Sequence, residues 1–191
     1  MRIDNHDQSL AGNCLVAMPS ITERAFRKAV ILICAHSPAG AIGLLINRPA
    51  MNMTLRQLLA EYGLPLPPIR PSVPLHVGGP ADIDRAFVLH SCEYHLPKHT
   101  HVVSDEISLT AERGILRDMG ASRGPDRAFV ALGYCGWGPC QLEREVQDGR
   151  WLTTASDGQM VFDTPSPQRW HAAMSGMGVA TFGLSQQFGH A

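Results

Sequence analysis

Apolar runs bounded by glycine, proline and polar residues fill the first quarter of the chain. Residues 12–18 are mostly apolar and stop before Pro19, residues 29–35 are apolar throughout, and residues 41–47 follow turn-forming residues at 36–40. Short runs that are apolar on both faces are typical of buried β-strands. The pattern predicts three strands, of which the second and third resemble a hairpin.

Helical spacing of apolar residues first occurs after Thr54. Thr54 and Gln57 match a capping box, and the apolar face that follows consists of Leu55, Leu58, Leu59 and Tyr62. This predicts a short amphipathic helix that ends at Gly63. Five prolines at 65–74 then exclude both helix and central strand, and favour either a hinge between two lobes or a surface loop.

Strand and helix patterns are interleaved in the rest of the chain. The strands that we expect are residues 75–77, 85–90, 99–104 and 128–134, with a hairpin of 151–155 and 160–162 around Asp157 and Gly158. The helices that we expect contain Leu109, Ile115, Leu116 and Met119 before a C-cap at Gly120, then residues 138–149 opened by Gly138 and Pro139, and last a helix begun by Ser166 and Pro167. Because these elements do not alternate regularly, the sequence predicts an α+β fold with a mixed, mainly antiparallel sheet and flanking helices.

Composition adds limits on size and location. The 191 residues, 45% of them apolar, suit one domain over 1–191, with two lobes as the alternative. The longest apolar run, 29–35, is shorter than the roughly 18 residues of a membrane span, and the N-terminus has no apolar signal segment. Five cysteines, an odd number, favour reduced thiols over a disulfide framework. We therefore expect a cytoplasmic protein with no membrane segment.

The charge balance restricts the class of partner. Sixteen Lys and Arg against 17 Asp and Glu leave a net charge of −1, so no overall field draws the chain onto nucleic acid or lipid. Nucleic-acid binding would need a local patch. Arg113, Arg117 and Arg123 share one expected helix, but no second helix follows at helix-turn-helix spacing, so direct DNA binding is poorly supported.

Several segments, in this order and spacing, resemble the AlgH/YqgE family from about residue 10 to residue 178. They are LVAMP (15–19), VILICAH (30–36), GAIGLLINRP (40–49), TLRQLL (54–59), VGGP (77–80), FVLH (87–90), LGYCGWGPCQLE (132–143) and FDTPSPQRW (162–170). The resemblance implies a compact α+β fold and the label of transcriptional regulator, without a catalytic residue. It also implies glycine where this chain has Cys140.

Three glycine- or proline-containing turns carry the candidate binding residues. Gly136 and Trp137 precede an expected helix whose Gln141 and Glu143 could cap it or line a groove, and this corner could seat an anion or serve only as a tight turn. Asn47 and Arg48 could clamp a carboxylate or phosphate, or Asn47 could simply bond the neighbouring turn. Gly78, Gly79 and Pro80 belong to no complete phosphate-loop motif and favour a tight turn.

Cysteine and histidine clusters offer weaker chemistry. Cys135 and Cys140 are spaced CxxxxC rather than CxxC, which does not favour a redox pair. His95, His99 and His101 lie near Cys92, but Pro97 interrupts any ligand helix, so we expect no metal site and no cofactor.

These observations favour a non-enzymatic binding or regulatory protein. We expect the three turns to border a cleft that binds a small anionic ligand or a loop of a protein partner. The alternative is an unrecognised enzyme, a hydrolase or a thiol redox protein, that uses the cleft near residues 136–143.

Overall fold

The computed structural model describes residues 9–51, 53–64 and 75–178, and the expected connector at 65–74 lies outside them. The strands are β1 (Asn13–Ala17), β2 (Val30–Ser37), β3 (Gly40–Leu45), β4 (Leu75–Val77), β5 (Ala81–His90), β6 (Thr100–Val102), β7 (Ser108–Thr110), β8 (Ala128–Trp137) and β9 (Trp151–Ala155). The helices are α1 (Leu55–Glu61), α2 (Arg113–Gly120), α3 (Gln141–Gln147), a π-helical turn η1 (Gln159–Asp163) and α4 (Ser166–Gly176).

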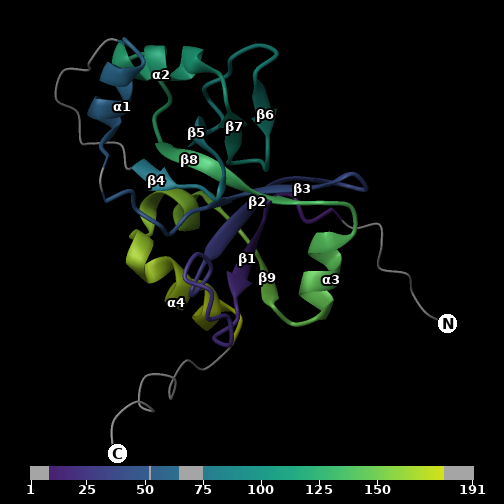
Figure 1. The fold of residues 1–191 in the computed structure, drawn as a ribbon. Helices are drawn as coiled ribbons and strands as arrows, with labels where there is room; N and C mark the ends of the chain where they lie inside the picture. Colours follow the sequence, from purple (N-terminus) through teal and green to yellow (C-terminus); the bar gives the residue numbers. More distant parts are fainter. Residues whose placement is uncertain (1–8, 52, 65–74, 179–191) are drawn as a thin grey trace, which may run out of the picture.

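The described strands form one curled sheet in the order β6-β7-β5-β8-β3-β2-β1-β9, with β4 beside β8 (Figure 1). Every pair is antiparallel except β4 with β8. Helices flank the sheet, with α1 and α2 near one end and α3 and α4 near the other. The mixed, mainly antiparallel α+β fold predicted from the sequence is therefore confirmed, as is the β2–β3 hairpin.

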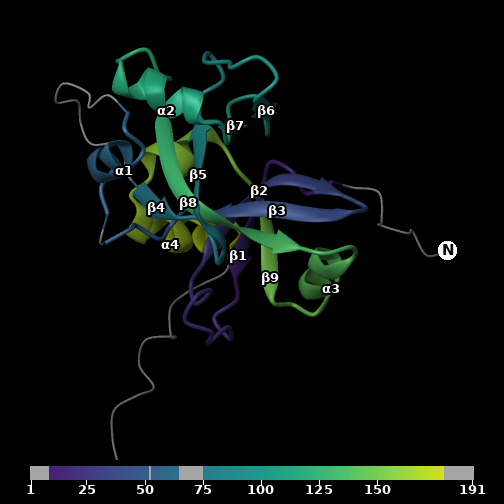
Figure 2. The ribbon, with the colours of Figure 1, turned by 45° about the horizontal axis from the view of Figure 1, so that its top comes forward.

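Strand β8 connects the two ends of the sheet (Figure 2). Its first half pairs with β5 and β4, and its last residues pair with β3. The change of partner occurs near Gly133, whose φ of 73° is in the left-handed region that favours glycine. A Cβ at Gly133 would lie 2.6 Å from the carbonyl oxygen of Gly79, so this crossing also requires the absence of a side chain.

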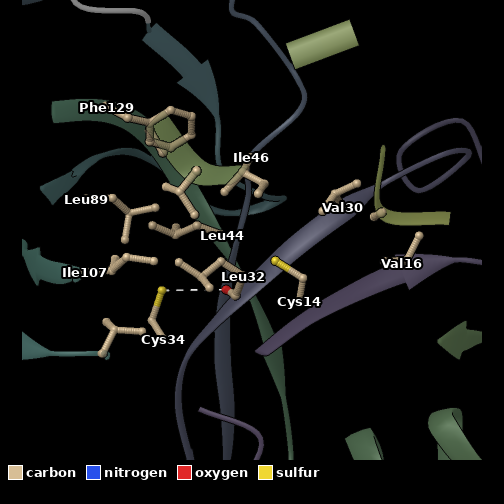
Figure 3. Packing of buried hydrophobic residues seen from close by; sticks show 14 of the residues in the cluster. Cys14, Val16, Val30, Leu32, Cys34, Leu44, Ile46, Leu89, Ile107 and Phe129 are labelled. Atoms are coloured by element: carbon tan, nitrogen blue, oxygen red, sulfur yellow. Dashed lines mark hydrogen bonds between the residues drawn. The ribbon is translucent and has the colours of Figure 1, made fainter. Parts of the chain in front are cut away.

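Buried apolar side chains from both ends of the sheet form the core. One cluster joins β1, β2 and β3 to Phe129 and to Trp170 and Met174 of α4. Cys14 and Cys34 lie among its aliphatic side chains, and the Cys34 thiol donates to the carbonyl of Leu32 at 3.6 Å (Figure 3). Both cysteines are therefore core residues, as apolar neighbours in the sequence indicate.

Local signals predicted α1 well. The Thr54 side chain accepts from the Gln57 backbone N–H, and the Gln57 side chain accepts from the Thr54 N–H, which completes the capping box. The apolar face of α1 is buried at Leu55, Leu58 and Leu59.

The structure corrects the expected hairpin around Asp157 and Gly158. β9 pairs with β1 instead, and residues 159–163 form the η1 turn. Asp157 accepts from the N–H of Met160 at 2.7 Å, and Glu106 accepts from the N–H of Gly158 at 2.6 Å. These bonds turn the chain away from β9, so no second strand can pair there.

Two expected helix starts are also wrong. Leu109 lies in β7, and α2 begins only at Arg113 and runs through Gly120 to a C-cap at Ala121. Pro139 does not open α3: β8 continues to Trp137, and α3 starts at Gln141 after Cys140, whose φ is 58°. The left-handed residue separates the proline from the helix.

In residues 9–51, 53–64 and 75–178, no helix combines the length and the apolar character that crossing a membrane requires.

Candidate functional site

The corner between β8 and α3 is held by a half-buried carboxylate. Trp137 and Trp151 both donate their indole N–H to Glu145 Oε2, at 3.1 and 2.8 Å. The Gln141 side chain donates to Glu145 Oε1 at 2.9 Å and accepts from the N–H of Gly138 at 3.1 Å. We call Trp137, Gln141, Glu145 and Trp151 the Glu145 clasp.

The charge of Glu145 is stabilised within the protein. Burial opposes its ionisation, but hydrogen bonds from Trp151, Gln141 and Trp137 outweigh burial and hold the pKa of Glu145 below its ordinary value. Because Trp137 is buried and its N–H is bound, this indole packs the corner rather than facing a ligand. Glu145 had no signal in the sequence, since its three partners come from β8, α3 and β9.

Glu143 is engaged by a histidine on β2. His36 Nδ1 accepts from the backbone N–H of Leu10 at 3.0 Å, which places the ring proton on Nε2. His36 Nε2 therefore donates to Glu143 Oε1, at 3.1 Å. Both ring nitrogens of His36 are therefore engaged within the protein.

The cysteines near this corner have different surroundings. Cys135 is buried and its thiol donates to the carbonyl of Gly78 at 3.6 Å, and burial raises the pKa of Cys135 to about 12. A thiol with this pKa stays protonated at neutral pH and is a poor nucleophile. Cys140 is exposed in the turn before α3. These surroundings do not favour a redox pair of Cys135 and Cys140.

Gly78 and Gly79 serve a close crossing of two chain segments. A Cβ at Gly78 would lie 2.2 Å from the carbonyl oxygen of Gly133, and one at Gly79 would lie 2.1 Å from the carbonyl carbon of Tyr134. The N–H of Gly78 also donates to Leu132 at 2.7 Å. These backbone groups are directed at β8, and Pro80 is exposed beside them.

Asn47 binds the end of the loop between β1 and β2. Its Nδ2 donates to the carbonyl of Lys28 at 2.7 Å, and its Oδ1 accepts from the N–H of Val30 at 2.9 Å. Asn47 is buried, so both side-chain groups are used inside the protein. The loop, drawn purple, lies below the sheet near α4 in both Figures 1 and 2.

Arg48 extends from the same strand end into a charged hollow. Its guanidinium donates to the carbonyl of Arg27. Arg24, Arg27, Lys28 and Arg48 line a cavity of about 510 Å³, which we call the basic hollow. Burial, followed by the charge of Arg27, lowers the pKa of Arg48, so the cations repel one another here.

None of the described residues that line the basic hollow is a carboxylate. The acid of the same loop, Glu23, instead pairs with Arg150 at 2.8 Å. Within the described part of the chain, none of the four lining cations is in an ion pair. The sequence reasoning found Arg48 but missed Arg24, Arg27 and Lys28, whose signal was three cations within five residues.

The three turns predicted to border one cleft, at 47–48, 78–80 and 136–143, lie at different points along β3. Gly136 pairs with Ile42 near the start of β3, whereas Arg48 follows the end of the same strand. Gly78 contacts β3 between these two points, because its carbonyl accepts from the N–H of Leu45 at 2.8 Å. The basic hollow is lined by Arg48 and by none of the other predicted site residues. Their role in binding stays a prediction.

A second hollow, of about 480 Å³, lies between α1, β5 and α2 and has both signs of charge. Its lining residues are Tyr62, Asp82, Asp84, Arg85, Ala86, Val88, Ala111, Glu112, Arg113 and Leu116. Arg113 lies over the Tyr62 ring at 4.5 Å, and Arg123 pairs with Asp118 at 3.0 Å. Two of the three arginines weighed for DNA binding are therefore engaged within the protein.

Of the histidines weighed as metal ligands, His101 lies in β6 and His99 immediately precedes this strand. His101 Nε2 lies 3.0 Å from the carbonyl oxygen of Cys34. Among the residues that the structure describes, no three His, Cys, Asp or Glu side chains are grouped as metal ligands would be.

Comparisons with known proteins agree over nearly the whole chain. A family described as AlgH-like matches residues 14–181. A UPF0301 protein from Cereibacter sphaeroides is 41% identical over 182 residues, covering 95% of this chain and 99% of the relative. A UPF0301 protein from Rhodospirillum rubrum is 37% identical over 189 residues, covering 99% and 98%.

Solved structures support the fold. The solution structure of the AlgH protein from Pseudomonas aeruginosa is similar with a TM-score of 0.78 and 34% identity, covering 100% of both chains. A crystal structure of a protein from Corynebacterium diphtheriae has a TM-score of 0.72 at 18% identity, covering 95% of this chain and 92% of that one, and bears on the fold alone. None of these names specifies a reaction, ligand or partner.

Proposed function

This chain belongs to the AlgH-like family, and from that premise we propose that it is a non-enzymatic binding or regulatory protein that holds a small anionic ligand in the basic hollow. The observation that carries the proposal is the grouping of Arg24, Arg27, Lys28 and Arg48 around one hollow, with no carboxylate among its described lining residues. In a chain of net charge −1 such a grouping is local, and it selects ligands by charge.

An anion would relieve the repulsion among these cations. Arg48 is partly buried and its pKa is lowered by burial and by Arg27, so its charge is incompletely solvated. Guanidinium groups bind carboxylate or phosphate oxygens through two parallel N–H bonds, which are shorter and stronger than neutral hydrogen bonds. Three of the four lining residues are arginines, which supports an oxyanion as the ligand.

Asn47 contributes by fixing the loop rather than by touching the ligand. Its bonds to Lys28 and Val30 hold the backbone on which the cations stand. A site held in place before binding loses less conformational entropy when the ligand arrives. The proposal thus gives the neighbours Asn47 and Arg48 different tasks.

The protein is proposed to act in the cytoplasm. All five cysteines are free thiols, which supports a reducing compartment. The transcriptional-regulator label gains no support from α2 and the turn after it, because Arg113 and Arg123 are engaged within the protein. Regulation through the bound anion remains compatible with that label.

Calorimetric titration with inorganic pyrophosphate tests the proposal. The full chain is compared with Arg48→Ala and with Arg117→Ala, an exposed arginine of α2 outside the hollow. We expect Arg48→Ala to weaken binding about tenfold or more, equivalent to about 1.4 kcal/mol, and Arg117→Ala to leave it unchanged. Equal affinity in all three proteins, or no binding by any of them, would refute the proposal.

A further inference from the structure

The chemistry that lines the basic hollow is uniform. Among the residues that the structure describes, its lining side chains are three guanidiniums and one ammonium, and no ring, amide or hydroxyl. Resting on the proposed function, we infer that the basic hollow binds a short chain of phosphate groups and recognises the phosphates rather than any group attached to them. Inorganic polyphosphate and the phosphate arm of a nucleotide share this chemistry.

The number of charges favours a polyvalent ligand. Orthophosphate carries one to two negative charges at neutral pH and would leave the four cations partly unneutralised. Glu23 does not reduce this excess, because its carboxylate binds Arg150 at 2.8 Å. A chain of two or three phosphates brings enough charge to match the hollow.

The number of hydrogen-bond donors in the basic hollow also favours a ligand with several linked phosphates. Each arginine has about five N–H donors and the lysine about three, all without acceptor capacity. Arg48 uses one of its donors on the carbonyl of Arg27. A carboxylate has two oxygens to offer, whereas linked phosphates present several oxygen edges that separate guanidiniums can bind at once.

The size of the hollow accommodates such a chain. Its volume of about 510 Å³ lies within the roughly 300–1,000 Å³ usual for small-molecule sites. Arg24, Arg27 and Lys28 stand on one short loop, while Arg48 approaches from the end of β3. The cations therefore contact a ligand from two segments of the chain, which suits an extended anion.

The described lining residues of this hollow include no aromatic ring on which a nucleoside base could stack. The nearby aromatic ring, Trp170, is buried, and its indole N–H donates to the carbonyl of Ala17 at 2.9 Å. The ammonium of Lys28 lies over the ring, 5.2 Å from its centroid. Since the ring face is occupied by a cation, an attached base should add little affinity.

The loop is also held in a conformation that presents its cations. Lys28 has a φ of 55°, in the left-handed region, and Asn47 binds its carbonyl at 2.7 Å. The N–H of Ala29 donates to the carbonyl of Phe26 at 2.9 Å, closing the turn that carries Arg27 and Lys28.

Calorimetric titrations of the full chain at fixed ionic strength and without divalent cations test the inference. The probes are orthophosphate, tripolyphosphate, citrate and ATP, and the proteins are wild type, Arg48→Lys, Arg24→Gln and the control Arg117→Gln. Citrate carries several charges on carboxylates, and ATP carries the triphosphate with a nucleoside. Circular dichroism checks that each variant is folded.

We expect tripolyphosphate to bind at least tenfold more tightly than orthophosphate or citrate, and ATP to bind within about threefold of tripolyphosphate. Arg24→Gln and Arg48→Lys should each weaken tripolyphosphate several-fold, while Arg117→Gln should not. The inference would be overturned if orthophosphate or citrate bound as tightly as tripolyphosphate. If that binding still depended on Arg48, the proposed function would stand. ATP binding tenfold more tightly than tripolyphosphate would overturn recognition of the phosphates alone. Failure of every probe would refute the proposed function itself.

Discussion

The guanidinium of Arg48 donates to the backbone carbonyl of Arg27, so one cation of the basic hollow contacts the loop that carries the other three. The contact links the end of β3 to the loop between β1 and β2. It places like charges side by side, an arrangement that favours an anion between them.

Asn47→Ala and Arg48→Ala should separate stability from binding. Removing the Asn47 amide leaves the buried N–H of Val30 and the carbonyl of Lys28 without their partner, which costs about 2–4 kcal/mol of unfolding free energy. Arg48→Ala should cost about 1 kcal/mol or less of unfolding free energy and weaken anion binding about tenfold or more. Urea unfolding and pyrophosphate titration measure the two effects, and equal losses of stability would contradict the division of roles.

Glu145→Gln should loosen the corner between β8 and α3. A neutral amide accepts more weakly from the indoles of Trp137 and Trp151, so we expect a loss of about 1–2 kcal/mol. Tryptophan fluorescence during urea unfolding measures it.

The effect of Glu145→Gln should depend on pH. Because the folded state lowers the pKa of Glu145, its contribution is present above the ordinary value of 4.5 and is lost as pH falls through the folded pKa. The stability difference between wild type and variant should therefore shrink in acid. A difference that is constant from pH 7 to pH 3 would show that the carboxylate charge has no part in the clasp.

His90 should make stability fall in mild acid. Its Nδ1–H donates to the carbonyl of Ser91 at 3.0 Å, so Nε2 of the neutral ring accepts from the Thr110 hydroxyl at 3.0 Å. Thr110 Oγ1 lies 2.8 Å from Thr100 Oγ1, which accepts from the N–H of Leu96 at 2.9 Å. A second ring proton would reverse this chain of bonds.

Burial lowers the pKa of His90 below its ordinary 6.5, so the unfolded chain binds a proton at a higher pH than the folded one. Its contribution to stability is complete above pH 6.5 and declines as pH falls toward the folded pKa. His90→Asn should be less stable at pH 8 but lose less stability between pH 7.5 and 5.5, as measured by urea unfolding. Parallel curves for the two proteins would contradict this.

Thiol labelling separates the exposed from the buried cysteines. Cys92 and Cys140 are exposed, whereas burial raises the pKa of Cys14 and Cys135 to about 12 and also raises that of Cys34. We expect two thiols to react rapidly with Ellman's reagent in the native protein and five after denaturation. Rapid modification of Cys135, located by mass spectrometry, would revive the thiol redox alternative.

Local patterns predicted the elements whose causes are local. The Thr54 and Gln57 capping box defines α1, and the apolar runs define the β2–β3 hairpin. The pairing of β9 with β1 could not be read in this way, because the strands are distant in sequence. One domain over 1–191 stays a prediction, supported by the pairing of β8 with strands from both ends of the sheet.

The candidate site was likewise predictable from the sequence only in its local features. The sequence indicated that Gly78 and Gly79 form a tight turn. It could not show that the backbone of Gly133 and Tyr134 approaches them, because this is a tertiary contact. Arg48 drew attention by its residue type, whereas its joining with Arg24 depends on how the loop folds back. The sequence shows three cations within residues 24–28, but it does not show that Arg48 lies beside them.

The most direct test of the basic hollow is an NMR titration of the full chain with tripolyphosphate, followed through backbone amide shifts. We expect the largest changes at the amides of Arg24, Arg27, Lys28 and Arg48, with saturation that the Arg48→Ala variant loses. Shifts concentrated instead at residues 136–143, or none at all, would contradict the account.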